Sequence, residues 1–408
     1  MDRHNLFPLR VRERHDESQH DEFRAARTRG HRWVRQFGLR VLIDYADVQA
    51  VLTDHRFRTS GVDYLPKRGV TSGPLFEWRK IILSTQPPDI HRMLRALVSH
   101  SFTAEVLARL RVSVAEHTIN DCTELGRADT ADLVTTIFHR VPIKSLCDAL
   151  GFSPSDLDRL DIVSTELGAM FGGVVPFTPD EIRRLDDAIV ELTQLARKAI
   201  ADRRSRPGPD VTTRLIAAAD SFGLGEDRLA AIISNLVIGG HGITRALLSC
   251  TTYTLLGQPD RWRQLAADPG LAARTVEEAN RLHCPAATLP YVAMRDLDVN
   301  GLRIERDELV LLSVLAANRD PAQFREPDRF DPDRSETRHL GMGGGPHYCI
   351  GAPVARVIAQ ETMATVASRF PDAELPDPTV PWTPISQLRA PAALRVCLGR
   401  VPAASTPR

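Results

Sequence analysis

The sequence has six cysteines but no C-x-x-C pair, and their spacing is wide and irregular: Cys122, Cys147, Cys250, Cys284, Cys349 and Cys397. This pattern does not match a disulfide framework. A chain of 408 residues also buries enough surface to fold without one. Free thiols persist in a reducing compartment, so we expect a cytoplasmic protein.

The chain also lacks net charge and long apolar runs. Lys+Arg and Asp+Glu both number 52, which argues against general nucleic-acid binding. No run of about 18 apolar residues occurs, the length that a membrane span requires. The longest apolar stretch, Leu229 to Leu256, is interrupted by Asn235, His241 and Arg245, and it predicts a long buried helix. Residues 1–22 have no apolar segment of the kind found in signal peptides, so no membrane association is expected.

Apolar spacing predicts helices and a few short strands. Residues 105–203 carry apolar side chains mostly three or four positions apart, as in helices, and Pro207, Gly208 and Pro209 interrupt them. Asn300-Gly301 favours a tight hairpin turn within residues 297–304. A second hairpin is expected at 33–43, a strand or short helix at 309–314, and further helices at 46–52, 226–256, 272–282 and 353–370.

No internal repeat or long linker divides the chain. We expect one large domain over residues 26–400, mainly α-helical with a minor β-sheet region. The polar segment 1–25 before it is a candidate for disorder, and residues 401–408 form a C-terminal tail.

The most informative segment is a glycine-rich loop, residues 338–346, followed by Cys349 and a helix that Pro353 helps to open. Glycines let the backbone approach a flat partner closely. Cys349 comes just before a helix N-terminus, where the dipole and unpaired N–H groups favour a thiolate over a thiol. A thiolate held in this way is a good ligand for iron.

Three other interpretations of this segment are open from the residues alone. Cys349 could be an ordinary buried cysteine, the usual fate of a lone thiol. His339, His347 and Cys349 could bind zinc, although their spacing fits no common zinc pattern and a fourth ligand is missing. The glycines could form a dinucleotide-binding turn, but Pro346 and the absence of a strand–helix unit argue against it.

The segment Met342-Gly343-Gly344-Gly345-Pro346-His347-Tyr348-Cys349-Ile350-Gly351 resembles the haem-binding signature of the cytochrome P450 superfamily, soluble bacterial type. Met342 stands where that signature usually has Phe, and the resemblance continues to Arg356 in the following helix. It implies the cytochrome P450 fold, with haem b between the long central helix and the helix after the cysteine. Cys349 would be the iron ligand.

Other motifs of that family occur in the same order. Glu278 and Arg281 resemble its E-x-x-R pair, and Arg329 matches the arginine that completes the pair as a buried structural network. His91 and Arg95 resemble its H-x-x-x-R motif, which binds the haem propionates, and His347 resembles another propionate contact. Tyr291 occupies a place where the family usually has a propionate-binding arginine, so weaker binding is expected there.

The central helix departs from the family pattern Ala/Gly-Gly-x-Asp/Glu-Thr. Aligned on Gly239-Gly240, the acid position is Gly242 and the threonine position is Ile243, so both proton-handling groups are missing. Thr244 lies one residue further, about 100° around the helix, and is not expected simply to replace the threonine. We rank three explanations: a substrate that supplies its own proton donor, oxidative coupling or cyclisation, and direct use of peroxide. Gly242, Ile243 and Thr244 are the candidate catalytic residues.

The resemblance implies a haem-thiolate monooxygenase for a small molecule of secondary metabolism, with electrons from NAD(P)H through ferredoxin and ferredoxin reductase. A substrate bound to a carrier protein is also considered. The alternatives are a peroxide-driven haem oxidase and a non-catalytic partner protein that keeps the fold. Candidate pocket segments are 62–82, 170–177, 238–247, 285–291 and 386–388.

Overall fold

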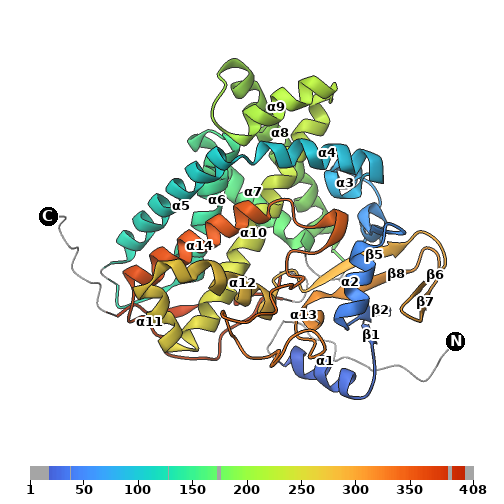
Figure 1. Ribbon diagram of the computed structural model, residues 1–408. Helices are drawn as coiled ribbons and strands as arrows, with labels where there is room; N and C mark the ends of the chain where they lie inside the picture. The colour runs from blue at the N-terminus through green and yellow to red at the C-terminus, as the bar shows by residue number, and fades with distance from the viewer. Residues whose placement is uncertain (1–17, 37, 127, 172–175, 385–387, 400–408) are drawn as a thin grey trace.

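Helix α10 (Glu226–Leu256) runs through the middle of the protein, and other helices pack around it (Figure 1). The computed structural model describes residues 18–36, 38–126, 128–171, 176–384 and 388–399. By length and composition, α10 is the one helix in these ranges that could cross a membrane, but 67% of its most apolar window is buried inside the protein. This burial is what the core helix of a globular domain shows, as the sequence predicts.

The remaining α-helices pack around α10. They are α1 (Gln19–Thr28), α2 (Tyr45–Thr53), α3 (Pro74–Ile81), α4 (Pro88–Ser101), α5 (Ala104–Leu125), α6 (Arg140–Leu150), α7 (Leu157–Leu167), α8 (Pro179–Ser205), α9 (Val211–Phe222), α11 (Pro259–Ala267), α12 (Ala272–His283), α13 (Val314–Ala317) and α14 (Ala352–Arg369). Short 3₁₀ turns lie at Gly61–Tyr64, Pro66–Arg68, Leu83–Thr85 and Gly345–His347.

A five-stranded sheet in the order β1-β2-β8-β5-β3 lies to one side of the helices, next to α2 (Figure 1). Within it, β2 and β8 pair parallel and the other neighbours pair antiparallel. Two-stranded sheets form from β4 with β9 and from β6 with β7. The strands are β1 (Trp33–Gln36), β2 (Leu39–Leu42), β3 (Phe57–Thr59), β4 (Thr130–Asp132), β5 (Thr288–Ala293), β6 (Leu297–Val299), β7 (Leu302–Ile304), β8 (Leu309–Ser313) and β9 (Arg395–Cys397).

The elements expected from local sequence signals are confirmed. Both hairpins form, and Asn300 and Gly301 have φ values of 51° and 83°, as a type I′ turn requires. The ambiguous segment 309–314 is strand β8 followed directly by the short helix α13.

Two expectations need correction. The stretch 105–203 is not wholly helical, because it contains strand β4 and one turn of π-helix at Val134–Phe138. β4 pairs with β9, which lies about 260 residues further along, so local spacing could not indicate it. Helix α1 begins at Gln19, inside the segment expected to be disordered, while residues 1–17 and 400–408 lie outside the described ranges. The extent of a single domain over 26–400 stays a prediction.

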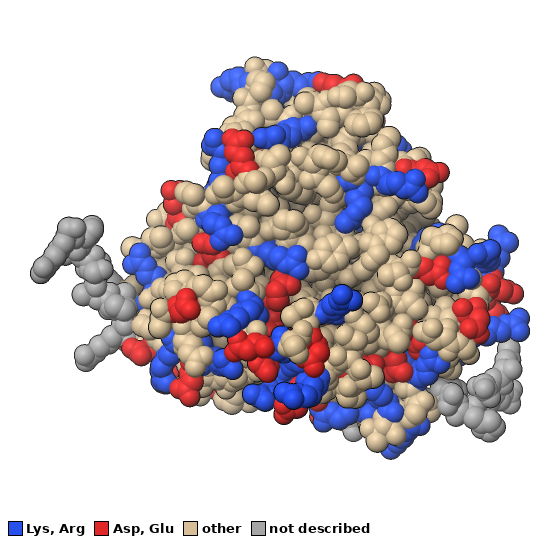
Figure 2. Space-filling model, in the orientation of Figure 1, with Lys and Arg blue, Asp and Glu red and all other residues tan. Residues whose placement is uncertain are grey.

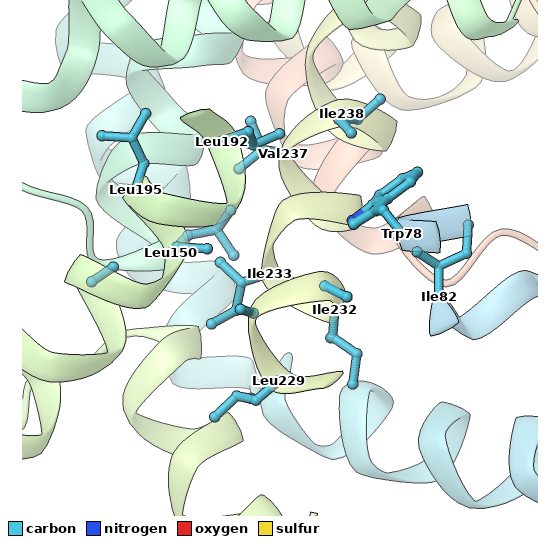
Figure 3. Packing of buried hydrophobic residues seen from close by; sticks show 14 of the residues in the cluster. Trp78, Ile82, Leu150, Leu192, Leu195, Leu229, Ile232, Ile233, Val237 and Ile238 are labelled. Atoms are coloured by element: carbon cyan, nitrogen blue, oxygen red, sulfur yellow. The ribbon is translucent and has the colours of Figure 1, made fainter. Parts of the chain in front are cut away.

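The largest apolar cluster packs α3, α8 and the first half of α10 together. Figure 3 shows Trp78 of α3 projecting toward α10 beside Ile238, with Ile82 next to it. Leu192 of α8 approaches α10 from the other side, near Val237. This packing fixes α10 between the two helices. On the face in Figure 2, acidic and basic side chains are interspersed, in keeping with the zero net charge.

Candidate functional site

A hydrogen bond within the cysteine loop and a close contact with α2 hold the loop in place. The Cys349 N–H donates to the Met342 carbonyl at 2.8 Å, which closes the loop on itself. Gly345 has φ of 58°, and a Cβ there would overlap the carbonyl oxygen of Leu52 in α2. At this position glycine is therefore required by the close approach of α2.

A second attachment joins the loop and α14 to α12. Glu277 accepts hydrogen bonds from Arg356 at 2.7 Å and pairs with His339 at 3.1 Å. Burial alone would raise the pKa of Glu277, but these two partners lower it to about 2. The other ring nitrogen of His339 accepts from the Gly341 N–H. Both nitrogens of His339 are thus occupied, which removes it as a ligand in the zinc interpretation.

The Cys349 thiol does not behave as the helix position alone predicts. Burial raises its pKa, although the N–H groups of Gly351 and Ala352 and the charges of Arg95 and Arg356 act in the opposite direction. The helix N-terminus contributes, as expected, but desolvation outweighs it. A metal ion bound at the sulfur would stabilise the thiolate against this desolvation.

Cys349 faces a cavity between α10 and α14. The cavity encloses about 1080 Å³ of space between protein atoms, part of it open to solvent. Its lining is mostly apolar, as in sites for flat or apolar ligands. The lining residues are Leu83, Val98, Phe102, Leu146, Ala149, Leu150, Ile232, Asn235, Leu236, Gly239, Gly240, Ile243, Thr244, Leu247, Asn280, Pro285, Gly341, Met342, Cys349, Ile350, Gly351, Val354 and Ala355.

Four residues predicted to bind the haem propionates come together beside the loop. The rings of His91 and His347 lie 4.3 Å apart, and the ring of Tyr291 lies 6.4 Å from that of His347. Burial, together with the charge of Arg95, lowers the pKa of both histidines, that of His347 to about 4. Within the described ranges no carboxylate pairs with these side chains.

This donor set fits haem b. These four side chains can all donate hydrogen bonds, and no carboxylate of the described residues pairs with them. The two propionates of haem would be suitable anionic partners. The sulfur of Cys349, two residues after His347, would supply the soft ligand for iron.

The segment of α10 that holds the candidate catalytic residues presents more than one face to the cavity. Gly239, Gly240, Ile243 and Thr244 all line it. A Cβ at Gly239 would meet no atom within 4 Å, so this glycine opens onto free space, whereas one at Gly240 would lie 2.9 Å from Leu146. Gly242 does not line the cavity, and a Cβ there would contact Leu388 in an apolar cluster. An acid at this position would extend toward apolar side chains.

A buried polar cluster fixes the rotation of this segment. His241 is 1% exposed, accepts from Ser164 at Nδ1 (2.8 Å) and donates from Nε2 to the His139 carbonyl (3.0 Å). Burial lowers the pKa of His241 to about 4, so the ring is neutral. The His139 ring pairs with Asp161 at 2.7 Å. The nitrogens and oxygens of this cluster are satisfied by one another, which gives it a structural role beneath α10.

The E-x-x-R network forms, but with a different third member. Glu278 pairs with Arg281 at 2.8 Å and with Arg334 at 3.0 Å, all three being almost fully buried. The predicted Arg329 is wrong: its side chain is 57% exposed and pairs with Glu326. Only the backbone carbonyl of Arg329 takes part, as an acceptor for Arg281 and Arg334.

The predicted pocket segments are partly confirmed. Residues of 238–247 and Pro285 line the cavity, whereas the lining within the described ranges has none from 62–82 or 170–177. Sequence reasoning missed Asn235 and Asn280. Asn280 lies inside the E-x-x-R motif, and its amide nitrogen is buried without a partner in the described residues. The E-x-x-R motif specifies only its two charged residues, so it gives no signal for the asparagine between them.

The comparisons with known proteins agree with this geometry. The sequence model for Cytochrome P450 matches residues 260–392. The chain is 32% identical over 363 residues to Nocardicin C N-oxygenase from Nocardia uniformis subsp. tsuyamanensis, covering 86% of this chain and 87% of the relative. It is also 32% identical over 361 residues to Mycinamicin IV hydroxylase/epoxidase from Micromonospora griseorubida, with the same coverage.

Solved structures give the same result. P450BioI in complex with a hexadec-9Z-enoic acid ligated Acyl Carrier Protein superposes with a TM-score of 0.85 at 25% identity, over 93% of this chain and 98% of that one. A mutant of P450 EryK with erythromycin B gives 0.81 at 27% identity, over 95% and 98%. With relatives this similar over most of its length, and with Cys349 facing the cavity, the chain belongs to the cytochrome P450 family of haem b monooxygenases.

Proposed function

We propose that this enzyme oxygenates a small, largely apolar molecule of bacterial secondary metabolism in the cytoplasm, with Cys349 as the iron ligand. The observation that carries the proposal is the position of Cys349 in a mostly apolar cavity beside four basic or phenolic side chains suited to propionates. When bound, haem activates dioxygen. The names of the relatives, which act on nocardicin and mycinamicin compounds, support this substrate class. Titrating candidate metabolites while recording the haem spin state tests it, and a panel that never shifts the spin state contradicts it.

Among the described residues that line the cavity, Thr244 is best placed to supply a proton. It is 1% exposed, lines the cavity, and its hydroxyl has no partner among the described residues. Four other hydroxyl side chains of α10 donate to the carbonyl four residues earlier: Ser234, Ser249, Thr251 and Thr254. Thr252 donates to Met363. The free hydroxyl of Thr244 therefore stands out on this helix, and a substrate group or ordered water can complete its hydrogen bonding.

We expect Thr244→Val to keep the shape of the cavity but to divert electrons from product to peroxide, lowering product per NAD(P)H by roughly 100-fold. Carbon monoxide bound to the ferrous haem should show a shifted C–O stretching frequency, because a nearby hydroxyl is lost. Thr251→Val is the matched control, since its hydroxyl is already bonded to the Leu247 carbonyl.

The companion variant Ile243→Thr adds a hydroxyl at the position where the family pattern has threonine. It should change the coupling or the product distribution, because Ile243 also lines the cavity. Unchanged coupling and C–O frequency in Thr244→Val would remove Thr244 from the proposal. Unchanged turnover, products and peroxide in Ile243→Thr would show that Ile243 does not face the oxygen site.

Cytochrome P450 monooxygenases need redox partners, and we propose a ferredoxin with its reductase. Of three arginines considered for docking, Arg356 is engaged by Glu277 and Arg95 is half-buried, whereas the Arg92 side chain is 80% exposed. Arg92→Ala should raise the apparent KM for ferredoxin about two- to fivefold, the size of one surface ion pair. Kinetics that do not change with the variant or across a salt series would exclude docking there.

A further inference from the structure

Side chains from the start and the end of the cysteine loop are joined to one carboxylate, that of Glu277 on α12. At the start, His339 pairs with Glu277, and its other ring nitrogen accepts from a backbone N–H of the loop. At the end, Arg356 of α14 donates to both Glu277 oxygens, at 2.7 and 2.8 Å, and to the Tyr348 hydroxyl at 3.0 Å. Tyr348 immediately precedes Cys349, so this chain of contacts ends beside the sulfur-bearing residue.

The pair of Glu277 and Arg356 brings together two opposite charges that are partly removed from water. Their side chains are only 32% and 31% exposed. The pKa of Glu277, lowered to about 2, keeps this carboxyl ionised, and the hydrogen bonds that Glu277 accepts raise the pKa of Arg356. A bidentate contact of this kind fixes the distance between the charges. The two charges therefore cancel each other at distances that are long compared with their separation.

Arg356 lies close enough to Cys349 for its charge to act there. Helix α14 begins at Ala352, and Arg356 is four residues, or about 6 Å along the axis, from that start. Its hydrogen bond to Tyr348 holds the guanidinium toward the loop. The positive charges of Arg95 and Arg356 both lower the pKa of the Cys349 thiol, against the effect of burial. Any group that neutralises Arg356 therefore changes the electrostatic potential at the sulfur.

We propose that Glu277 is a positioning residue that sets the reduction potential of the haem iron by neutralising Arg356. This inference rests on the proposed function, in which Cys349 is the iron ligand. Charge and hydrogen bonding around a ligand sulfur are among the means by which a protein adjusts the potential of its iron. A positive charge without its carboxylate would draw electron density from the thiolate and favour ferrous iron. A carboxylate without its arginine would favour ferric iron.

Potentiometric titration of the ferric–ferrous couple in the substrate-free holoenzyme tests this. Glu277→Gln should raise the midpoint potential, and Arg356→Gln should lower it. Each change should alter the equilibrium constant for reduction at least about tenfold, which is about 59 mV for one electron. The double variant should return close to the parent value, because neither charge remains. Glu361→Gln is the control for loss of one carboxylate: Glu361 also pairs with an arginine, Arg111, but lies five residues further along α14.

A role limited to holding the loop predicts a different result. Shifts of the same sign in the two single variants, or no shift in either, would overturn the proposal, as would an equally large shift in Glu361→Gln. Should Glu277→Gln bind no haem, Arg356→Gln decides alone, because the proposal requires its potential to fall. The carbon monoxide difference spectrum of the parent protein is recorded first. Absence of a thiolate band there contradicts the proposed function, whereas a thiolate band with unchanged potentials contradicts only the role of Glu277.

Discussion

Cys349→Ser is expected to abolish oxygenation and to remove the far-red Soret band of the ferrous carbon monoxide complex. A serine hydroxyl is almost the same size, but it does not form the soft, electron-donating thiolate that assists O–O bond cleavage. Turnover should fall by at least about 1000-fold, a large part of the rate acceleration that enzymes provide. The measurements are the carbon monoxide difference spectrum and product formation.

Cys397→Ser provides the matched control. Cys397 is a partly exposed free cysteine in β9 that does not line the cavity. It should retain the spectrum and the turnover of the parent enzyme. A thiolate spectrum that survives Cys349→Ser, or disappears in Cys397→Ser, would assign the iron ligand to another residue.

Glu278→Ala is expected to destabilise the protein by about 3–5 kcal/mol, because it leaves Arg281 and Arg334 buried without their shared carboxylate. The loss should appear as a lower urea midpoint with an unchanged slope. Haem incorporation during expression should fall as well, since α12 carries both Glu278 and the Glu277 contact to the cysteine loop.

Substitutions of Arg334 and Arg329 distinguish a buried member of the Glu278 network from an exposed arginine near it. Arg334→Ala should cost nearly as much as Glu278→Ala, because the Arg334 side chain is 6% exposed and bonded to both Glu278 oxygens. Arg329→Ala should change stability by less than about 1 kcal/mol, as expected for an exposed ion pair. Equal effects of the two substitutions would contradict the assignment of Arg334.

Local signals in the sequence predicted the elements that depend on neighbouring residues. The Asn300-Gly301 turn follows from residues that tolerate positive φ. Helix α10 follows from a long apolar stretch with polar interruptions. The cysteine loop is recognisable in the sequence because the family signature requires several residue types at fixed spacing. Strand β4 could not be foreseen, since its partner β9 lies far along the chain.

Sequence spacing does not show how deeply a side chain is buried or which way it points. Arg329 and Arg334 are five residues apart, and either fits a loose motif, but only Arg334 turns inward. For Thr244, spacing shows only that it lies about 100° from Ile243 on the helix. The cavity, however, wraps around enough of α10 to include both. For Cys349, the sequence indicated the helix N-terminus but not the desolvation that outweighs it.

The contacts of Gly345 with α2 and of Arg356 with Glu277 have a consequence for how the enzyme can diversify. Both contacts join the cysteine loop and α14 to other parts of the protein, not to a ligand. The Cys349 sulfur therefore keeps its position whatever substrate the cavity holds. Substitutions on the wall formed by α6 and α10 can then accumulate without displacing Cys349, the proposed metal ligand. Changes in one half of the cavity can then alter which substrates fit, while the other half keeps the cysteine in place.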